Sequence, residues 1–456
     1  MSTLVATVYK EHLMGRLPVV AMEEQIEAIS DSLQINQQIE QAFSDTGRAP
    51  EMCKSLEDLA FAVSQIREIT PKEAALIQIA GDVATSGSGS SSEENCITPA
   101  MEDMLNGKFS AGDIVKKVKD TVASILAAIR ELIRRVGNYV VSYISRATVV
   151  AGGSETRLKK LELAYRERGS SWKQDPAKRI KMVLPTVDGR VVNTMDDLIS
   201  ASKDYLKILE VFTRVANDAN YNYGSGMVRL FESGLGKGVE ADIPTYRDDL
   251  IKLMKLVSKS MDVGTVFPNA RDMIQSDGSI VVESRPLLGG VKLVSSTLPD
   301  DVFDKVTLTS SVSVRDYLGK VSRKNYLTVQ FQDGATTAQV EVQPMTERQL
   351  REVFDVIKQL LSFYSGRASN TSLVAAMQKR QAFAKQCCKS ITDRVQAMDQ
   401  TNPLAYALTV ESVGITDSIT RNATLPYLRL SENAGRIISY LLTAASKSLV
   451  ANTSAA

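Results

Sequence analysis

The sequence predicts a mainly α-helical protein with an inserted β subdomain (α+β), and three observations support this fold class. The first is a long amphipathic stretch at 113–147, the longest regular pattern in the chain. The second is a group of short β-branched segments at 263–343, bounded by Gly, Pro, Asp or Ser. The third is the return of helical periodicity at 344–456. We therefore expect a long central helix, a β-rich insertion and a helical C-terminal bundle.

The length and composition allow several domains with real hydrophobic cores. The chain has 456 residues, of which 44% are hydrophobic, as in a globular protein. A Ser/Gly-rich stretch at 84–97 predicts a flexible, protease-accessible linker. The predicted division is 1–83 for an acidic helical segment, 84–97 for the linker, 98–262 for a helical domain, 263–343 for the β-rich subdomain and 344–456 for the C-terminal helical bundle.

The charge is unevenly divided along the chain, although the formal total is only +1. Residues 1–94 contain six Lys or Arg and fifteen Asp or Glu, a net charge of −9, and the remainder has a net charge of +10. Such a split indicates that one part shields the other, that the parts have different partners, or only that domains differ in composition.

The long helix predicted at 113–147 is amphipathic. Its apolar residues recur at steps of three and four from Ile114 to Ile144, and Lys and Arg dominate its other surface. Three interpretations remain open: the spine of a helical domain with a solvated face, a helix lying on a membrane surface, and a helix lying against nucleic acid. Its frequent charges exclude a membrane-spanning segment.

Short motifs predict the remaining elements. Asp188–Gly189 predicts a hairpin at 181–193, and Asp333–Gly334 predicts a second hairpin that joins 326–331 to 337–343. The segment 305–314 also has the composition of a strand. Thr346 and Gln349 form a capping box for a helix that reaches Tyr364. Further helices are expected across 1–82, then at 195–232, 244–261, 372–398, 404–413 and 431–450, and the long helix is expected to end near the turn at 151–156.

The densest basic run follows the long helix and contains aromatic residues. Basic residues interleaved with aromatics suit phosphate contact and base stacking, although a solvated helix face explains the run equally well. The candidate DNA contacts are Arg157, Lys159, Lys160, Arg166, Arg168, Trp172, Lys173, Lys178, Arg179 and Lys181.

The sequence offers little for catalysis, cofactors or metals. His12 is the single histidine, which removes most Ser-His-Asp, Cys-His and His-based metal schemes. The Gly-rich segment 233–240 lacks the Ser or Thr and the glycine spacing of a phosphate-binding loop. The four cysteines have neither zinc spacing nor a disulfide framework, which fits a reducing compartment. No signal peptide is evident at the N-terminus, so we expect synthesis in a cytoplasm.

The first 45 residues, from Met1 to about Asp45, together with the basic remainder, resemble the internal head proteins of the giant phiKZ-like tailed phages. The resemblance implies an N-terminal propeptide that a prohead protease removes by cutting after Glu in a Ser/Ala-x-Glu context. Glu93, Glu94 and Glu102 fit that context. Glu23 fits it too, but within a predicted helix, and Glu155 departs from it at the first position.

The resemblance implies a non-enzymatic virion protein of the capsid interior, made in the host cytoplasm and packaged with the genome or ejected alongside it. Its expected partners are phage head proteins, the prohead protease and non-specific double-stranded DNA, with no cofactor and no small-molecule substrate. One alternative is a head scaffold or assembly protein that binds only other head proteins. Another is a membrane-active ejection protein that uses 113–147 as an amphipathic helix.

Overall fold

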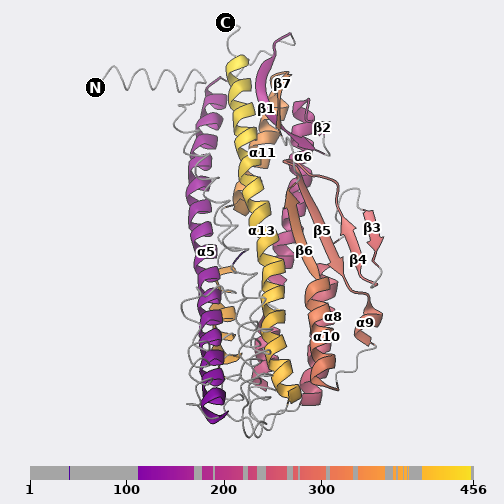
Figure 1. The fold of residues 1–456 in the computed structure, drawn as a ribbon. Helices are drawn as coiled ribbons and strands as arrows, with labels where there is room; N and C mark the ends of the chain where they lie inside the picture. The colour runs from indigo at the N-terminus through magenta and orange to yellow at the C-terminus, as the bar shows by residue number, and fades with distance from the viewer. Residues whose placement is uncertain are drawn as a thin grey trace, which may run out of the picture.

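Two long helices, α5 (Ala111–Arg168) and α13 (Pro403–Ala451), organise the molecule. The computed structural model describes residues 41, 111–168, 177–187, 190–218, 224–233, 243–263, 271–275, 278–304, 309–331, 337–364, 373–375, 378–383, 385–387, 389 and 403–452. The helices predicted across 1–82 and the linker at 84–97 lie outside this part, Gln41 alone excepted. Figure 1 shows α5 and α13 side by side, with most of the strands on the opposite side of α13 from α5.

Helix α5 is longer than the sequence pattern predicts. It spans 58 residues, about 87 Å at 1.5 Å per residue, and continues straight through the turn predicted at 151–156. Two adjacent glycines, Gly152 and Gly153, favoured that turn. The helix continues because Ala151, Ser154 and Leu158 are buried beside the core and extend the buried stripe across the glycines. The predicted end of this helix is therefore wrong.

Helix α13 joins the two helices predicted at 404–413 and 431–450 into one of 49 residues. Pro426 lies inside it, where a proline costs about 3 kcal/mol because it removes a backbone hydrogen bond and clashes with the preceding turn. Tyr427, Leu428 and Leu430 beside it are almost completely buried, so tertiary packing offsets this cost. The prediction of two separate helices is wrong.

Helices α6 (Met195–Asn217), α7 (Gly224–Ser233) and α8 (Ile243–Met261) follow the first strands. Thr194 caps α6 by accepting a hydrogen bond from the backbone N–H of Asp197 at 3.1 Å. The helix predicted at 195–232 is thus divided between α6 and α7, whereas the one predicted at 244–261 is confirmed as α8. Within the predicted helix 372–398, the described residues of 373–389 are helical.

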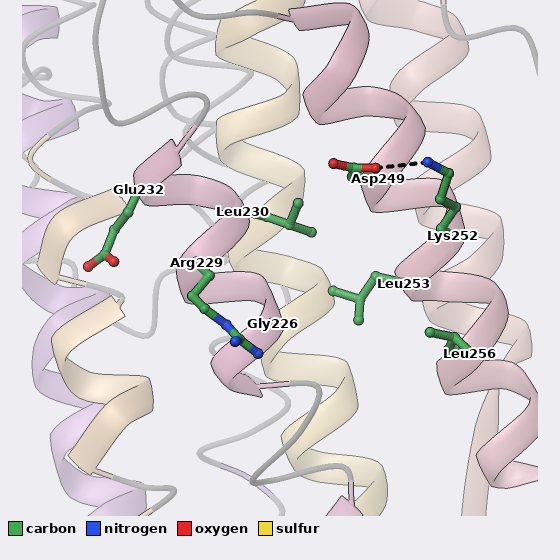
Figure 2. A pocket seen from close by; sticks show the side chains of 8 residues that line it. All are labelled: Gly226, Arg229, Leu230, Glu232, Asp249, Lys252, Leu253 and Leu256. Atoms are coloured by element: carbon green, nitrogen blue, oxygen red, sulfur yellow. Dashed lines mark hydrogen bonds and ion pairs between the residues drawn. The ribbon is translucent and has the colours of Figure 1, made fainter.

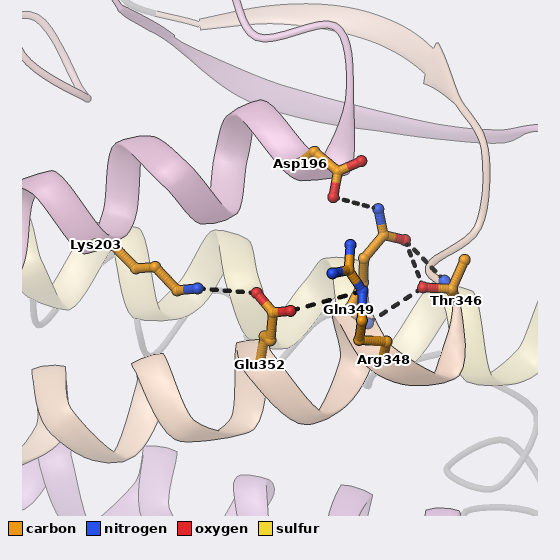
Figure 3. Close-up of polar contacts among 6 residues, drawn as sticks. All are labelled: Asp196, Lys203, Thr346, Arg348, Gln349 and Glu352. Atoms are coloured by element: carbon orange, nitrogen blue, oxygen red, sulfur yellow. Dashed lines mark hydrogen bonds and ion pairs between the residues drawn. The ribbon is translucent and has the colours of Figure 1, made fainter.

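The capping box predicted at Thr346 is confirmed and starts α11 (Glu347–Tyr364). The Thr346 hydroxyl accepts from the Gln349 N–H at 3.2 Å, and the Gln349 side chain accepts from the Thr346 N–H at 2.8 Å. The same amide donates to Asp196 at 2.7 Å, and Lys203 pairs with Glu352 at 2.8 Å (Figure 3). These contacts join the N-terminal halves of α6 and α11.

The strands form two antiparallel sheets in the described part of the chain. One has the order β2-β1-β7, from β1 (Ile180–Val187), β2 (Arg190–Val191) and β7 (Thr337–Val342). The other has the order β3-β4-β5-β6, from β3 (Arg271–Ile274), β4 (Ile280–Glu283), β5 (Val291–Thr297) and β6 (Tyr326–Phe331). The hairpin predicted at 181–193 is confirmed, because Val187 pairs with Arg190.

The hairpin predicted around Asp333–Gly334 is wrong, because β6 and β7 belong to different sheets. Strand β6 pairs with β5, and β7 pairs with β1 in a register that aligns Lys181 with Glu341. The alternation of apolar residues is correct, and Val329 and Val342 are both buried. Partners distant in sequence bury these faces, and a local turn motif carries no information about them.

The segment 305–314 is not a strand where the structure describes it. Helix α10 (Ser311–Lys324) starts there, after the short helix α9 (Asp300–Asp304). Ser310 is the N-cap, and its hydroxyl accepts from the Ser313 N–H at 3.1 Å. Serine-rich capping therefore overrides the strand propensity of the neighbouring β-branched residues.

One buried cluster joins these elements. It includes Val140 of α5, Leu184 of β1, Leu209 of α6, Val329 of β6 and Leu441 of α13, each with no exposed surface. The observed architecture is mainly helical with small antiparallel sheets, which confirms the predicted fold class.

Candidate nucleic-acid interface

The solvent-facing side of α5 carries the candidate interface, and we call it the α5 outer face. Lys159, Lys160 and Arg166 of the predicted DNA contacts are exposed on it. Lys159 forms an ion pair with Glu155 at 3.0 Å, a surface pair of small energy. These three side chains are therefore placed where a phosphate could reach them.

The uninterrupted helix aligns this group with basic residues farther back along α5. Among the described side chains of α5, the exposed basic ones are Lys116, Arg130, Arg134, Arg135, Arg146, Lys159, Lys160 and Arg166. The exposed acidic ones are Asp120, Glu155 and Glu167. The sequence prediction missed this continuity because it ended the helix too early. Buried Ala147, Ala151 and Leu158, spaced at helical intervals, are the signal that could have revealed it.

Glu131 forms a local ion-pair cluster within the basic face. Its carboxylate accepts from Arg134 at 2.6 and 2.7 Å and from Arg135 at 3.3 Å. The hydrogen bonds from Arg134 are the main reason that the pKa of Glu131 falls to about 2. The cluster stays ionised at neutral pH and leaves a net positive charge.

Tyr165, an aromatic residue of the basic run, is half-buried and bonded to side chains of α11. Its hydroxyl donates to Glu347 at 2.7 Å and accepts from Arg351 at 2.7 Å, and the Arg351 guanidinium lies 5.8 Å from the ring centroid. The ring also packs edge-on against Phe354. Tyr165 therefore ties α5 to α11 and is not a stacking platform for bases.

Two other predicted DNA contacts, Arg157 and Lys178, are half-buried against the rest of the protein. Arg157 is half-buried, burial lowers its pKa, and its Nη2 atom is buried without a hydrogen-bond partner in the described part of the chain. Lys178 is half-buried and donates to the carbonyl oxygen of Ala451, near the end of α13. Cations suit the C-terminal end of a helix, so Lys178 caps α13. Neither residue presents a fully exposed charge.

The remaining candidates lie at strand β1 or outside the described residues. Arg179 is exposed, and Lys181 is exposed and pairs with Glu341 at 3.2 Å across β1 and β7. The Arg168 side chain, Trp172 and Lys173 lie outside the described part. The candidate cleavage residues Glu93, Glu94 and Glu102 also lie outside it.

The groove between α7 and α8 offers no catalytic arrangement. It has a volume of about 740 Å³, and Figure 2 shows Leu230 and Leu253 beside the Asp249–Lys252 ion pair of 3.0 Å. Its polar side chains bond to protein neighbours: Arg229 donates to the carbonyl oxygen of Ser225, and Glu232 accepts from Gln386. None is a nucleophile beside a base. Its apolar floor is the contact between the two helices.

Neither metal-ligand clusters nor membrane-spanning helices occur in the described part of the chain. No group of three or more His, Cys, Asp or Glu side chains there could hold a metal ion. Each helix there is too short or too polar to cross a bilayer.

Comparison with known proteins identifies the family. The family model for phiKZ-like phage internal head proteins matches residues 19–399. No curated protein and no solved structure matches the chain. Because the match covers well over half of the 456 residues, the chain belongs to the phiKZ-like phage internal head proteins.

Proposed function

We propose that this structural protein of the capsid interior is matured by cleavage in the linker at 84–97 and then contacts packaged DNA through the α5 outer face. The supporting observation is the excess of exposed cations on α5 among its described side chains, eight against three exposed carboxylates, or four when the half-exposed Glu131 is included. Lys and Arg that neutralise phosphates release condensed counterions, which gives binding without sequence preference. Membership of the family supports a structural rather than an enzymatic role and implies contact with other head components.

The acidic segment at 1–94 has a role in this scheme before cleavage. Its net charge of −9 opposes the basic α5 outer face, so it masks that face while the head assembles. Cutting after Glu93 or Glu94, or after Glu102, would remove the negative charge and leave a basic body. Cleavage thus changes the charge that the protein presents to DNA.

A binding experiment compares the full-length chain with the form recovered from virions, using one double-stranded DNA duplex at 50 and 200 mM salt. The virion form should bind more tightly at 50 mM salt, and its affinity should fall at least about tenfold at 200 mM because counterions are released. Equal affinity of both forms at low salt would show that the acidic segment does not mask the face.

A triple variant locates the contact. Lys159→Glu, Lys160→Glu and Arg166→Glu together should weaken binding and lower the salt slope by up to about three, roughly one for each lost phosphate contact. The matched control is Lys207→Glu, Lys252→Glu and Arg348→Glu, whose side chains are 72%, 75% and 80% exposed on other helices. Both triples change the net charge equally. Equal loss in the two would exclude the α5 outer face as the specific contact.

The cleavage step has its own measurement. Mass spectrometry of purified virions should find a new N-terminus after Glu93, Glu94 or Glu102 and few peptides from 1–80. Recovery of peptides from 1–80 at the abundance of those from 200–452 would contradict the proposed cleavage. The DNA-binding experiment would still test the proposed contact with DNA.

A scaffold role that involves only other head proteins is the second candidate, and exposed apolar side chains on α5 favour it. Val141 is 43% exposed, Val149 is 76% exposed and Leu163 is 56% exposed. Such residues suit a protein partner better than DNA. Loss of incorporation into heads by Val149→Asp, with DNA binding unchanged, would favour this role.

The proposed function does not include membrane binding by the amphipathic helix at 113–147. The apolar stripe of α5, including Val136, Val140 and Tyr143, lies in the buried cluster. An amphipathic helix needs a free apolar face to enter a bilayer surface. The described stripe is committed to the core of the protein, which supports the spine interpretation of this helix.

A further inference from the structure

A small pocket lies between strand β6 and helix α13. Figure 1 shows β6 on the opposite side of α13 from α5. Its volume is about 360 Å³. One wall is β6 from Tyr326 to Val329, and the other includes Arg421, Leu425 and Arg429 of α13. Figure 1 shows that α13 runs directly beside β6. The volume is at the small end of the range for ligand sites in proteins.

The two arginines lie on the same face of α13. They are eight residues apart, which is about two helical turns. The Nη1 atom of Arg429 donates to the carbonyl oxygen of Val329, and this bond places the Arg429 guanidinium at the edge of the sheet. The pocket is therefore lined by two arginines from one helix.

Arg421 differs from Arg429 because the structure records no hydrogen bond or ion pair for it with the described chain. Its side chain is partly buried, and burial lowers its pKa. Arg380 is near it: burial, and then the charge of Arg421, lower the pKa of Arg380 to about 9. Glu432, the nearest described carboxylate along α13 toward the C-terminus, accepts instead from Arg436 at 2.8 Å. Among the described side chains, no carboxylate is recorded as a partner of the partly buried Arg421.

An arginine beside an edge strand ordinarily serves to cover the exposed edge of the sheet. Charged side chains often protect such edges from pairing with other chains. This explains Arg429, which binds a carbonyl oxygen of β6. It does not explain Arg421, for whose five N–H donors the described side chains provide no recorded acceptor.

We propose that the pocket binds an oxyanion, a carboxylate or a phosphate group, with Arg421 as the principal ligand and Arg429 as the second cation. A guanidinium presents two parallel N–H donors that match the spacing of carboxylate and phosphate oxygens. Binding would supply Arg421 with its missing acceptors and reduce its repulsion with Arg380. The site is separate from the α5 outer face and does not depend on DNA binding there.

The test measures thermal unfolding of the full-length chain at constant pH and ionic strength, with chloride replaced by phosphate or by citrate. Both anions stabilise proteins generally, so the informative quantity is the difference between the wild type and Arg421→Gln. The melting temperature of the wild type should rise more than that of the variant, by about 2 °C at tenfold excess over Kd. In chloride alone, Arg421→Gln should be at least as stable as the wild type, because it removes a partly buried charge for which the described side chains provide no recorded partner.

Two further variants control the experiment. Arg348→Gln removes a guanidinium that is 80% exposed on α11 and should keep the full anion effect. Arg421→Lys keeps the charge but not the planar fork, so it should fold and bind the anion about tenfold more weakly. It serves as the readout if Arg421→Gln does not fold.

The two anions also distinguish the source of the group. An effect of phosphate alone supports a site for phosphate esters, an effect of citrate alone supports a site for acidic side chains, and an effect of both supports a general oxyanion site. An equal rise in the wild type and in Arg421→Gln, or no rise with either anion, would overturn the proposal.

Discussion

Single buried hydroxyl groups fix how α5 and α6 lie on α13. The hydroxyl of Tyr143 donates to the carbonyl oxygen of Leu428 at 3.0 Å, and that of Tyr205 donates to the carbonyl oxygen of Leu430 at 2.8 Å. Burial raises the pKa of both phenols, so both stay protonated donors at neutral pH. These bonds lie just after Pro426, where α13 is weakened.

Removing one of these hydroxyls tests its contribution to stability. Tyr143→Phe should lower the free energy of unfolding by about 0.5–1.5 kcal/mol, because the lost bond is buried and the ring is kept. Tyr139→Phe is the matched control, since Tyr139 lies on the same helix and its hydroxyl has no recorded hydrogen bond to the described residues. Chemical denaturation measures both. Equal changes in the two variants would show that the Tyr143–Leu428 bond is not formed.

The Glu131 cluster predicts a pH dependence. The pKa of Glu131 falls from 4.5 to about 2, mainly through hydrogen bonds from Arg134. Because the pKa is lower in the folded state, the pair stabilises the protein above about pH 4.5, and this contribution is lost as the pH falls towards 2. The pair is exposed, so the effect on stability is small.

Titration by NMR should show the Glu131 carboxyl with a midpoint well below that of an ordinary glutamate. Arg134→Gln should raise the midpoint towards 4.5. A midpoint that does not move in Arg134→Gln would contradict the geometry of the cluster.

At the scale of elements, the continuity of α5 makes a further prediction. Gly152 and Gly153 are exposed, and a Cβ atom at either position would meet nothing within 4 Å. Gly152→Ala and Gly153→Ala should each raise the free energy of unfolding by up to about 1 kcal/mol, because alanine is the better helix former. Urea denaturation measures the gain.

Gly435 of α13 provides the contrast. A Cβ atom there would lie 3.2 Å from ring carbons of Tyr364, so Gly435→Ala should give no gain or a loss. If Gly152→Ala and Gly153→Ala destabilise the protein instead, the chain turns at these glycines as the sequence pattern suggests.

Signals confined to one element predicted the fold well. The Thr346 capping box, helix α8 and the hairpin of β1 and β2 all depend on neighbouring residues, and all three are confirmed. Elements that distant contacts hold in place were not predictable. Pro426 and the pair Gly152–Gly153 break helices by propensity, but buried neighbours from other elements keep those helices intact.

For the candidate nucleic-acid interface, too, the sequence predicted local features but not contacts between distant residues. Composition identified Lys159, Lys160 and Arg166 as a basic group, and the structure places them on an exposed face. Composition could not show that Tyr165 and Lys178 are bound to α11 and α13, because those partners are far away in sequence. Arg421 gave no sequence signal, since its pocket arises only where α13 meets β6.

At the scale of the whole molecule, contacts cross the boundaries proposed at 262 and 343. Strand β1 pairs with β7 over six residue pairs, and both belong to one sheet. Helix α13 packs against α5, α6, α10, α11 and β6. We therefore propose that the regions 98–262, 263–343 and 344–456 unfold together, although they differ in sequence pattern.

One core substitution in each region tests this proposal. Leu184, Leu327 and Ile357 are 0%, 2% and 0% exposed and belong to one cluster. Replacing each with alanine removes buried methyl groups and should cost about 2–5 kcal/mol. If the cluster is one cooperative unit, all three variants should lower the midpoint of the same calorimetric transition, with calorimetric and van't Hoff enthalpies equal. Two transitions, each lowered by a different substitution, would show that the sheet and the helices unfold independently and that their shared core is energetically weak.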